Sequence, residues 1–284
     1  FFSRYAGIDM ESRSFFISSN SDFRLLEGDC LTVIPQIEND VDMVFADPPY
    51  FLSNGGQTVK NGKIQSVNKG DWDKLISDND AYVFTYEWLS AVRDKMADNA
   101  TIWVSGTHHN IFTLGRILPQ LGFKILNVIT WEKTNPPPNF SCRFFTHSTE
   151  FIIWARKHPK VPHYFDYDLM KRLNNDKQMK DVWRLPAIAK WEKSCGKHPT
   201  QKPLALLAQI ILASTKKDAL ILDPFAGSST TGIAGHVLER RFIGIEQEFD
   251  YLKLSQARYE DLQEDGRKEF FKKHFYRLLN KTDI

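Results

Sequence analysis

Short apolar runs alternate with amphipathic stretches along most of the chain. Apolar runs rich in β-branched and aromatic residues predict buried strands, whereas apolar positions spaced three and four apart predict helices. Strands are expected at about 23–27, 41–46, 100–105, 123–132, 149–156, 219–222 and 241–245, and helices at about 30–37, 80–97, 108–121, 203–215, 229–239 and 248–262. This alternation predicts an α/β fold with a mostly parallel sheet, in which ligands bind at the carboxyl ends of the strands.

The tetrapeptide Asp47-Pro48-Pro49-Tyr50 directly follows the strand predicted at 41–46. A proline turn that ends a buried strand is one interpretation, because proline fixes φ and removes an N–H donor. That interpretation explains neither Asp47 nor Tyr50. A nucleobase amino group needs an acceptor for its N–H, a second carbonyl acceptor and an aromatic face. Asp47, the Pro48 carbonyl and Tyr50 would supply all three, so the motif favours a protein that handles such an amine.

A second motif lies where the strand predicted at 219–222 runs into Asp223 and a turn of small residues before a helix. Strand, turn and helix N-terminus in this order are typical of nucleotide-binding units, although the turn also suits plain helix–sheet packing. Glu246 ends the next strand, nineteen positions after Gly227, where an acidic group meets ribose hydroxyls. The turn lacks the lysine and hydroxyl of a Walker motif, and Asp223 would repel a phosphate and attract a cation. S-adenosylmethionine, which is cationic and has no phosphate, is therefore favoured over NAD or ATP.

Length and composition set limits on the organisation of the chain. A chain of 284 residues with 42% hydrophobic content fits one large domain with an insertion. We expect this domain at 22–262, an N-terminal extension at 1–21 without an assigned role, and a basic amphipathic element at 263–284. The last could pack on the body, contact DNA or form a dimer, and packing is favoured because its phenylalanines and leucines form one face.

Charge, cysteines and hydropathy exclude several classes of protein. The net charge is only +2, so any contact with nucleic acid must come from local clusters of basic residues. The three cysteines are odd in number and widely spaced, which argues against a disulfide framework and a zinc site, and no metal is expected. No apolar run reaches the roughly 18 residues of a membrane span. We therefore expect a cytoplasmic protein with no membrane contact.

Two polar segments are candidates for contact with a substrate. Residues 51–73 contain several glycines and few apolar residues, and we interpret them as a lid over the target base, with a surface excursion as the alternative. Residues 133–147 combine proline, aromatic and basic residues, which favours DNA contact over a rigid linker. Residues 157–198 add many lysines, so 133–198 as a whole is the expected segment for DNA contact and target recognition. Many of these lysines could instead form a solvated face.

Taken together, the two motifs resemble the β class of DNA amino-methyltransferases, in which the catalytic tetrapeptide precedes the cofactor turn. The resemblance covers roughly 23–260 and extends to the stretches 51–56, 69–74, 145–150 and 198–203. Within this class the chain is most similar to the second adenine methyltransferase of GATC restriction-modification systems, a type that acts on single-stranded as well as duplex DNA. One departure is Ser229, where the family turn often has glycine.

The resemblance implies a Rossmann-like, S-adenosylmethionine-dependent methyltransferase fold and a set of site residues. Asp47 and the Pro48 carbonyl would accept hydrogen bonds from the amine, and Tyr50 would stack on a base extruded from the helix. Asp29 would bind the adenine of the cofactor, or it would simply cap a helix. Lys202 would neutralise the cofactor carboxylate, or it would simply mark the start of a helix. The implied catalytic residues are Asp47, Pro48, Pro49 and Tyr50, and the implied cofactor-binding residues are Asp29, Cys30, Thr200, Gln201, Lys202, Asp223, Phe225, Ala226, Gly227, Ser228, Ser229 and Glu246.

The implied activity is methylation of adenine N6 in a specific DNA sequence, GATC by resemblance. The implied partners are double- or single-stranded DNA, a functionally paired restriction endonuclease, and a second copy of the chain in a possible homodimer. Three alternatives stay open: an N4-cytosine methyltransferase of the same class, a catalytically idle DNA-binding subunit, and a methyltransferase of RNA or protein glutamine. An aspartate at the first position of the tetrapeptide favours adenine.

Overall fold

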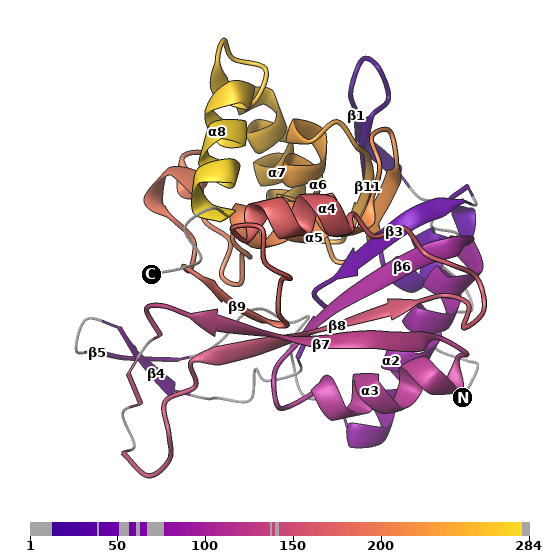
Figure 1. Cartoon of the computed structure of the whole chain (residues 1–284), viewed down its shortest axis with the longest axis vertical. Helices are drawn as coiled ribbons and strands as arrows, with labels where there is room; N and C mark the ends of the chain where they lie inside the picture. Colours follow the sequence, from indigo (N-terminus) through magenta and orange to yellow (C-terminus); the bar gives the residue numbers. More distant parts are fainter. Residues whose placement is uncertain are drawn as a thin grey trace.

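Nine strands form one sheet in the computed structural model, which describes residues 13–38, 40–50, 57–60, 63–66, 77–136, 138–139 and 142–279. The strand order is β1-β2-β11-β10-β3-β6-β8-β7-β9 (Figure 1). The strands are β1 (Arg13–Ile17), β2 (Phe23–Glu27), β3 (Val41–Ala46), β6 (Met96–Gly106), β7 (Lys124–Lys133), β8 (Thr149–Arg156), β9 (Val182–Leu185), β10 (Leu220–Asp223) and β11 (Arg241–Glu246).

The sheet is parallel in its centre and antiparallel towards both edges. β2, β11, β10, β3 and β6 run parallel to one another, and β9 runs parallel to β7. β8 pairs antiparallel with both β6 and β7, and β1 pairs antiparallel with β2. The predicted mostly parallel α/β fold is therefore confirmed. β1 lies in the N-terminal extension, where the sequence pattern predicted no element.

Helices cover both faces of this sheet (Figure 1). One face packs against α1, α2 and α3, and the other packs against α4 to α8, so the sheet separates two hydrophobic cores. The central strands contribute to both cores, because residues next to each other on a strand point to opposite faces. On β3, for example, Val44 belongs to the first core, which contains α1 to α3, and Phe45 belongs to the second core, which contains α4 to α8. The helices are α1 (Cys30–Val33), α2 (Asp78–Lys95), α3 (Ile111–Gln120), α4 (Tyr167–Leu173), α5 (Leu204–Ser214), α6 (Thr230–Val237), α7 (Phe249–Asp261) and α8 (Arg267–Leu279).

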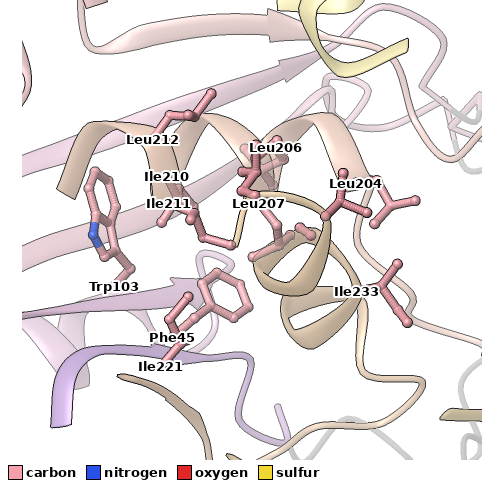
Figure 2. Packing of buried hydrophobic residues seen from close by; sticks show 14 of the residues in the cluster. Phe45, Trp103, Leu204, Leu206, Leu207, Ile210, Ile211, Leu212, Ile221 and Ile233 are labelled. Carbon is pink, nitrogen blue, oxygen red and sulfur yellow. The ribbon is translucent and has the colours of Figure 1, made fainter. Parts of the chain in front are cut away.

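Helix α5 lies in the middle of the second core. All of its residues, Leu204–Ser214, are buried, and its leucines and isoleucines pack against Phe45, Trp103 and Ile221 of the sheet and Ile233 of α6 (Figure 2). A helix that is apolar on every side is stable only when it is covered on every side. Here the sheet lies on one side, and α6 and α8 contact the helix from others. The start of α5 is therefore a firmly held point in the fold.

The segments expected to touch substrate have mixed outcomes. The 133–198 segment contains α4, β9 and the short 3₁₀ helix Lys190–Lys193, none of which the sequence pattern predicted. The expected lid, 51–73, lies mostly outside the described residues, apart from the hairpin strands β4 (Gln57–Lys60) and β5 (Lys63–Ser66).

The C-terminal element forms α8 and packs on the body through the buried Phe271 and Phe275, as the favoured alternative expected. No helix in the described part of the chain is long and apolar enough to cross a membrane.

Close packing of α6 on the sheet leads to a stability prediction. A Cβ at Gly232 would overlap the Phe242 ring and lie 2.7 Å from Cε2 of Phe23, two fully buried side chains. Gly232→Ala should therefore lower the free energy of unfolding by about 1–3 kcal/mol, the usual cost of overpacking. Urea denaturation followed by circular dichroism would measure it.

Gly115→Ala in α3 is the matched control, because a Cβ there meets nothing within 4 Å. It should leave stability unchanged or raise it by up to about 1 kcal/mol, since alanine is the better helix former. Equal effects of the two substitutions would contradict the packing argument.

Candidate active site

A cavity of about 280 Å³ opens at the carboxyl ends of β2, β3, β10 and β11. The edge is a topological switch point, because the chain continues from β3 to one side of the sheet and from β10 to the other. Every predicted site residue except Ser229 lines this cavity. Stretches that lie far apart in the sequence, around residues 28, 47, 200 and 225, therefore meet in one place.

The tetrapeptide forms one wall of the cavity. The Tyr50 hydroxyl donates a hydrogen bond to Asp47 Oδ1 at 2.6 Å and lies 3.3 Å from Oγ of Ser105 on β6. Burial and the neighbouring Asp47 carboxylate raise the pKa of Tyr50 above its usual range, so the phenol stays neutral and acts as a donor. The arrangement presents a carboxylate and an aromatic ring side by side.

Lys202 reaches this wall from the residue before Pro203, the N-cap of α5. Its Nζ lies 2.5 Å from Asp47 Oδ2, 3.4 Å from the Tyr50 hydroxyl and 3.6 Å from Oε2 of Glu150 on β8. Burial alone would lower the pKa of Lys202, but the carboxylates hold it well above the usual value. Lys202 was expected beside the cofactor carboxylate; the structure places its ammonium against Asp47 and Tyr50.

Glu150 and Lys133 extend this charged group onto the antiparallel strands. Lys133 Nζ lies 2.5 Å from Oε1 of Glu150. Burial would raise the pKa of Glu150, but the ammonium groups of Lys202 and Lys133 lower it. From the sequence, both residues fall in the segment expected to contact DNA, 133–198, and neither was expected in the active site; position 150 also fell in a stretch that resembles the family. No local pattern indicates that β7 and β8 bring this pair towards Asp47.

The second motif forms another part of the cavity lining. Asp223 ends β10; its Oδ1 accepts a hydrogen bond from the Phe225 N–H at 3.0 Å and its Oδ2 from the Thr231 hydroxyl at 2.6 Å. Burial raises the pKa of Asp223 to about 7, despite these two hydrogen bonds. A buried carboxylate with such a raised pKa attracts a cationic group and disfavours a phosphate.

Glu246 at the end of β11 holds the turn in shape. Its Oε2 accepts from the Gly227 N–H at 2.8 Å, and its Oε1 accepts from the backbone N–H groups of Gln247 and Glu248 at 2.9 Å. Burial raises its pKa. Gly227 has a φ of +51°, and a Cβ there would lie 3.1 Å from Nε2 of His198, so only glycine fits comfortably.

Ser229, expected to bind the cofactor, is not among the residues that line the cavity. It is fully buried outside the cavity lining, and it precedes α6 in the left-handed region, φ +53°, without a side-chain capping bond. A glycine adopts this conformation freely, which explains why the family often has glycine here. Buried Arg258 supports the turn by donating to the Ser228 carbonyl, the Ser228 hydroxyl and the Thr230 hydroxyl. Burial lowers the pKa of Arg258 to about 10, and sequence reasoning missed this residue.

The remaining lining residues come from loops next to the turn. His198 accepts a hydrogen bond from the Thr200 N–H at Nδ1 and packs edge-on against Tyr251; burial lowers its pKa to about 4, so the ring is neutral. Gln201 is buried and donates to the Glu192 carbonyl. Asp29 caps α1 by accepting from the Leu31 N–H, and it also lines the cavity, so both of its expected roles fit the geometry. Cys30 also lines the cavity, and its thiol is kept protonated because burial raises its pKa.

Sequence comparisons define the family to which this site belongs. The family described as DNA methylase matches residues 41–257, a span that includes both the tetrapeptide and the acidic turn. The chain belongs to this family, which confirms the expected resemblance.

Curated relatives are similar over most of the chain. It is 59% identical over 265 residues to Type II methyltransferase M2.MboI of Moraxella bovis, covering 93% of this chain and 97% of the relative. It is 57% identical over 221 residues to Type II methyltransferase M2.DpnII of Streptococcus pneumoniae, covering 78% and 82%.

Solved structures show the same fold. The crystal structure of the M1.HpyAVI-SAM complex is 29% identical, with a TM-score of 0.65, over 84% of this chain and 98% of that chain. The cytosine-N4-specific PvuII DNA methyltransferase is 19% identical, with a TM-score of 0.67, over 91% and 93%. At that identity the second likeness shows the fold alone.

The ion pair in the corner leads to a second stability prediction. Lys202 and Asp47 are 8% and 15% exposed, so Lys202→Met would leave a largely buried carboxylate without its cation. We expect a loss of about 3 kcal/mol in the free energy of unfolding, near the lower end of the cost of breaking a buried pair. Urea denaturation would measure it.

The double variant Lys202→Met with Asp47→Asn is the control for this prediction. It should recover a large part of the loss, because the uncompensated charge is gone. If the losses in the free energy of unfolding of the two single variants, Lys202→Met and Asp47→Asn, simply added in the double variant, the ion pair would not be the source of the effect.

Proposed function

We propose that this member of the DNA methylase family transfers a methyl group from S-adenosylmethionine to the N6 amino group of adenine in DNA. The observation that carries the proposal is the Asp47 carboxylate, hydrogen-bonded to Tyr50 at 2.6 Å, in the same cavity as the acidic turn. The sequence GATC is part of the proposal and rests on the resemblance to the second methyltransferases of GATC systems. The similarity to two Type II methyltransferases named M2 supports it.

The residues of the turn fit S-adenosylmethionine. Among the described lining residues, four carboxylates face one ammonium, that of Lys202, which suits a ligand with cationic groups and no phosphate. Asp223 and the Gly227 turn would hold its methionine portion, Glu246 its ribose hydroxyls and Asp29 its adenine. The solved complex of M1.HpyAVI with SAM supports the choice of cofactor. When bound, S-adenosylmethionine supplies a methyl group activated by its sulfonium.

Asp47 and Pro48 would activate the adenine amine by holding its two hydrogens. The amine is a poor nucleophile because its lone pair is delocalised into the ring. Hydrogen bonds from the N–H groups to the Asp47 carboxylate and the Pro48 carbonyl localise that lone pair and fix its direction. As the nitrogen forms its new bond to carbon, it becomes positively charged and passes one proton to Asp47. Catalysis then comes from positioning and electrostatics, and no covalent bond to the protein is needed.

Tyr50 would hold the target base after it leaves the duplex. Extrusion of a base costs a few kcal/mol, and stacking on an aromatic ring contributes about 1–3 kcal/mol per base. The Tyr50 hydroxyl is already fixed by Asp47 and Ser105, so the ring needs little further ordering. Single-stranded DNA avoids the cost of breaking the base pair, which favours it as a second substrate.

The segment 133–198 is the proposed surface for DNA contact and target recognition. Phe144 and Phe145 are 57% and 96% exposed, and Arg143 lies beside them in the sequence. Exposed aromatic and basic side chains are the usual contacts to unpaired bases and phosphates. A restriction endonuclease of matching specificity and a second copy of the chain complete the proposed partners.

An N4-cytosine methyltransferase is the alternative, because the cytosine amine has similar chemistry and would fit the same corner. An assay with the purified chain and tritiated S-adenosylmethionine would test both functions. The DNA would be single- or double-stranded, with or without GATC. Digestion of the product to nucleosides should give N6-methyladenine. N4-methylcytosine would establish the alternative.

Asp47→Ala should remove label transfer, by at least about a thousandfold, because the main acceptor for the amine is lost. Cofactor affinity measured by calorimetry should change less than about threefold, since Asp223, Glu246 and Asp29, the residues assigned to the cofactor, are all retained. A collapse of cofactor affinity would contradict this division of roles. Unchanged transfer would exclude Asp47 from catalysis.

Cofactor affinity should depend on pH through Asp223. Its pKa is about 7 in the free protein, so it is largely protonated at pH 6, whereas a cationic ligand binds the ionised form. Affinity should therefore rise with pH, by roughly tenfold between pH 6 and 7.5, and level off above this range.

Asp223→Asn is the matched variant for this titration. It should bind more weakly and lose the part of the pH dependence that comes from residue 223, while any titration of the ligand itself remains. Calorimetry at several pH values would measure both. The same pH dependence in both proteins would exclude Asp223 as the titrating group.

A further inference from the structure

One ammonium lies between two buried carboxylates in the catalytic corner. Lys202 Nζ is bound to Asp47 Oδ2 at 2.5 Å, and Oε2 of Glu150 lies only 3.6 Å from the same nitrogen. All three side chains are at most 16% exposed. Lys202 therefore has two possible anionic partners and is hydrogen-bonded to one of them.

Oε2 of Glu150 is a buried acceptor without a hydrogen bond in the described structure. The other oxygen, Oε1, is bound to Lys133 at 2.5 Å, which fixes the carboxylate on β8. The nearest donor to Oε2 is the Lys202 ammonium at 3.6 Å, so this buried oxygen is paired in charge but not closely hydrogen-bonded, and such atoms in native proteins usually have a reason. A movement of Lys202 by about 1 Å would give this oxygen a normal charge-assisted bond of about 2.7–2.9 Å.

The chemistry proposed for Asp47 requires such a movement. The amine nitrogen becomes positive as it is methylated, and an ammonium bound to Asp47 would repel that charge. The same ammonium would also weaken Asp47 as an acceptor for the departing proton. In the structure Asp47 accepts from both Tyr50 and Lys202, one bond on each oxygen, so an entering amine competes directly with Lys202.

We propose that Glu150 is a positioning residue that takes Lys202 from Asp47 when the target amine enters the corner. The inference rests on the proposed role of Asp47. Before the base arrives, Lys202 neutralises Asp47 and keeps the buried carboxylate stable. When the amine takes its place on Asp47, Lys202 swings to Oε2 of Glu150, where its charge is farther from the reacting nitrogen. Lys133 holds Glu150 still during this exchange.

A double-mutant cycle on stability tests the exchange without cofactor or DNA. In Asp47→Asn, Lys202 should move to Glu150, and in Glu150→Gln it should stay on Asp47, so each single change should shift the urea midpoint modestly. The double variant leaves Lys202 buried without an anion. Its midpoint should therefore fall by more than the sum of the two single shifts, or it should fail to fold where both single variants fold. Additive shifts would show that Glu150 is no alternative partner and would overturn the proposal.

A kinetic test separates positioning from binding. Single-turnover methyl transfer by Glu150→Gln should slow by at least about thirtyfold, because Lys202 then stays on Asp47. Affinities for the cofactor, and for an oligonucleotide with 2-aminopurine at the target position, should stay within about threefold. Glu150→Asp keeps the charge and should recover part of the rate.

Glu132→Gln is the matched control, since Glu132 precedes Lys133 on the same strand and pairs with the half-exposed Arg184. It should leave the single-turnover rate unchanged. A wild-type rate in Glu150→Gln, or a loss of affinity that accounts for the whole rate change, would overturn the role of Glu150. If Asp47→Ala kept its activity, the proposed function would fail, whereas the stability cycle would still report on the two partners of Lys202.

Discussion

The parallel pairing of β3 with β10 is the constraint on which the site depends. The register places Leu222 beside Val44, so the two strands end almost level, with Asp47 after one and Asp223 at the end of the other. The two residues are far apart in the chain, yet parallel alignment brings them to one edge of the sheet. A one-residue slip would reverse the faces of β3 and move Phe45 out of the core that contains α5. Core packing therefore fixes the distance between the two motifs.

Buried charge is the second theme of the molecule. Asp47, Lys202, Glu150 and Lys133 form an electrically balanced group, so the corner contains ions without a large net charge. Asp223 has no cation among its described partners, and burial accordingly raises its pKa to about 7. The group around Asp47 is thus neutralised from within, whereas Asp223 can pair with a charge that comes from outside. This difference agrees with the proposal of a substrate base beside Asp47 and a cationic cofactor beside Asp223.

The sequence alone predicted the central strands and helices closely, because their apolar periodicity is strong and each motif follows a strand directly. Fifteen of the sixteen site residues that it named line the cavity, since they lie within short motifs, whereas other lining residues such as Phe84 and Tyr251 were not named. It could not predict α4 or β9, whose stability comes from tertiary contacts, or the contribution of Glu150 and Lys133 to the corner, which depends on how β7 and β8 pair. The contact of the Lys202 ammonium with Asp47 was not foreseen for the same reason: proximity in a motif does not show the direction in which a side chain points.

The anchoring of α5 limits which part of Lys202 can move. Lys202 directly precedes a helix that is buried on all sides, and the Leu204 N–H is bound to buried Glu192 at 2.7 Å, so its backbone is held by the core. Only the four-carbon side chain is left to rotate. Rotamer changes of this kind take place in picoseconds to nanoseconds when exposed and more slowly when buried, whereas hinge motions of domains take microseconds to milliseconds. The proposed exchange of Lys202 between its two carboxylates would therefore need no movement of the scaffold.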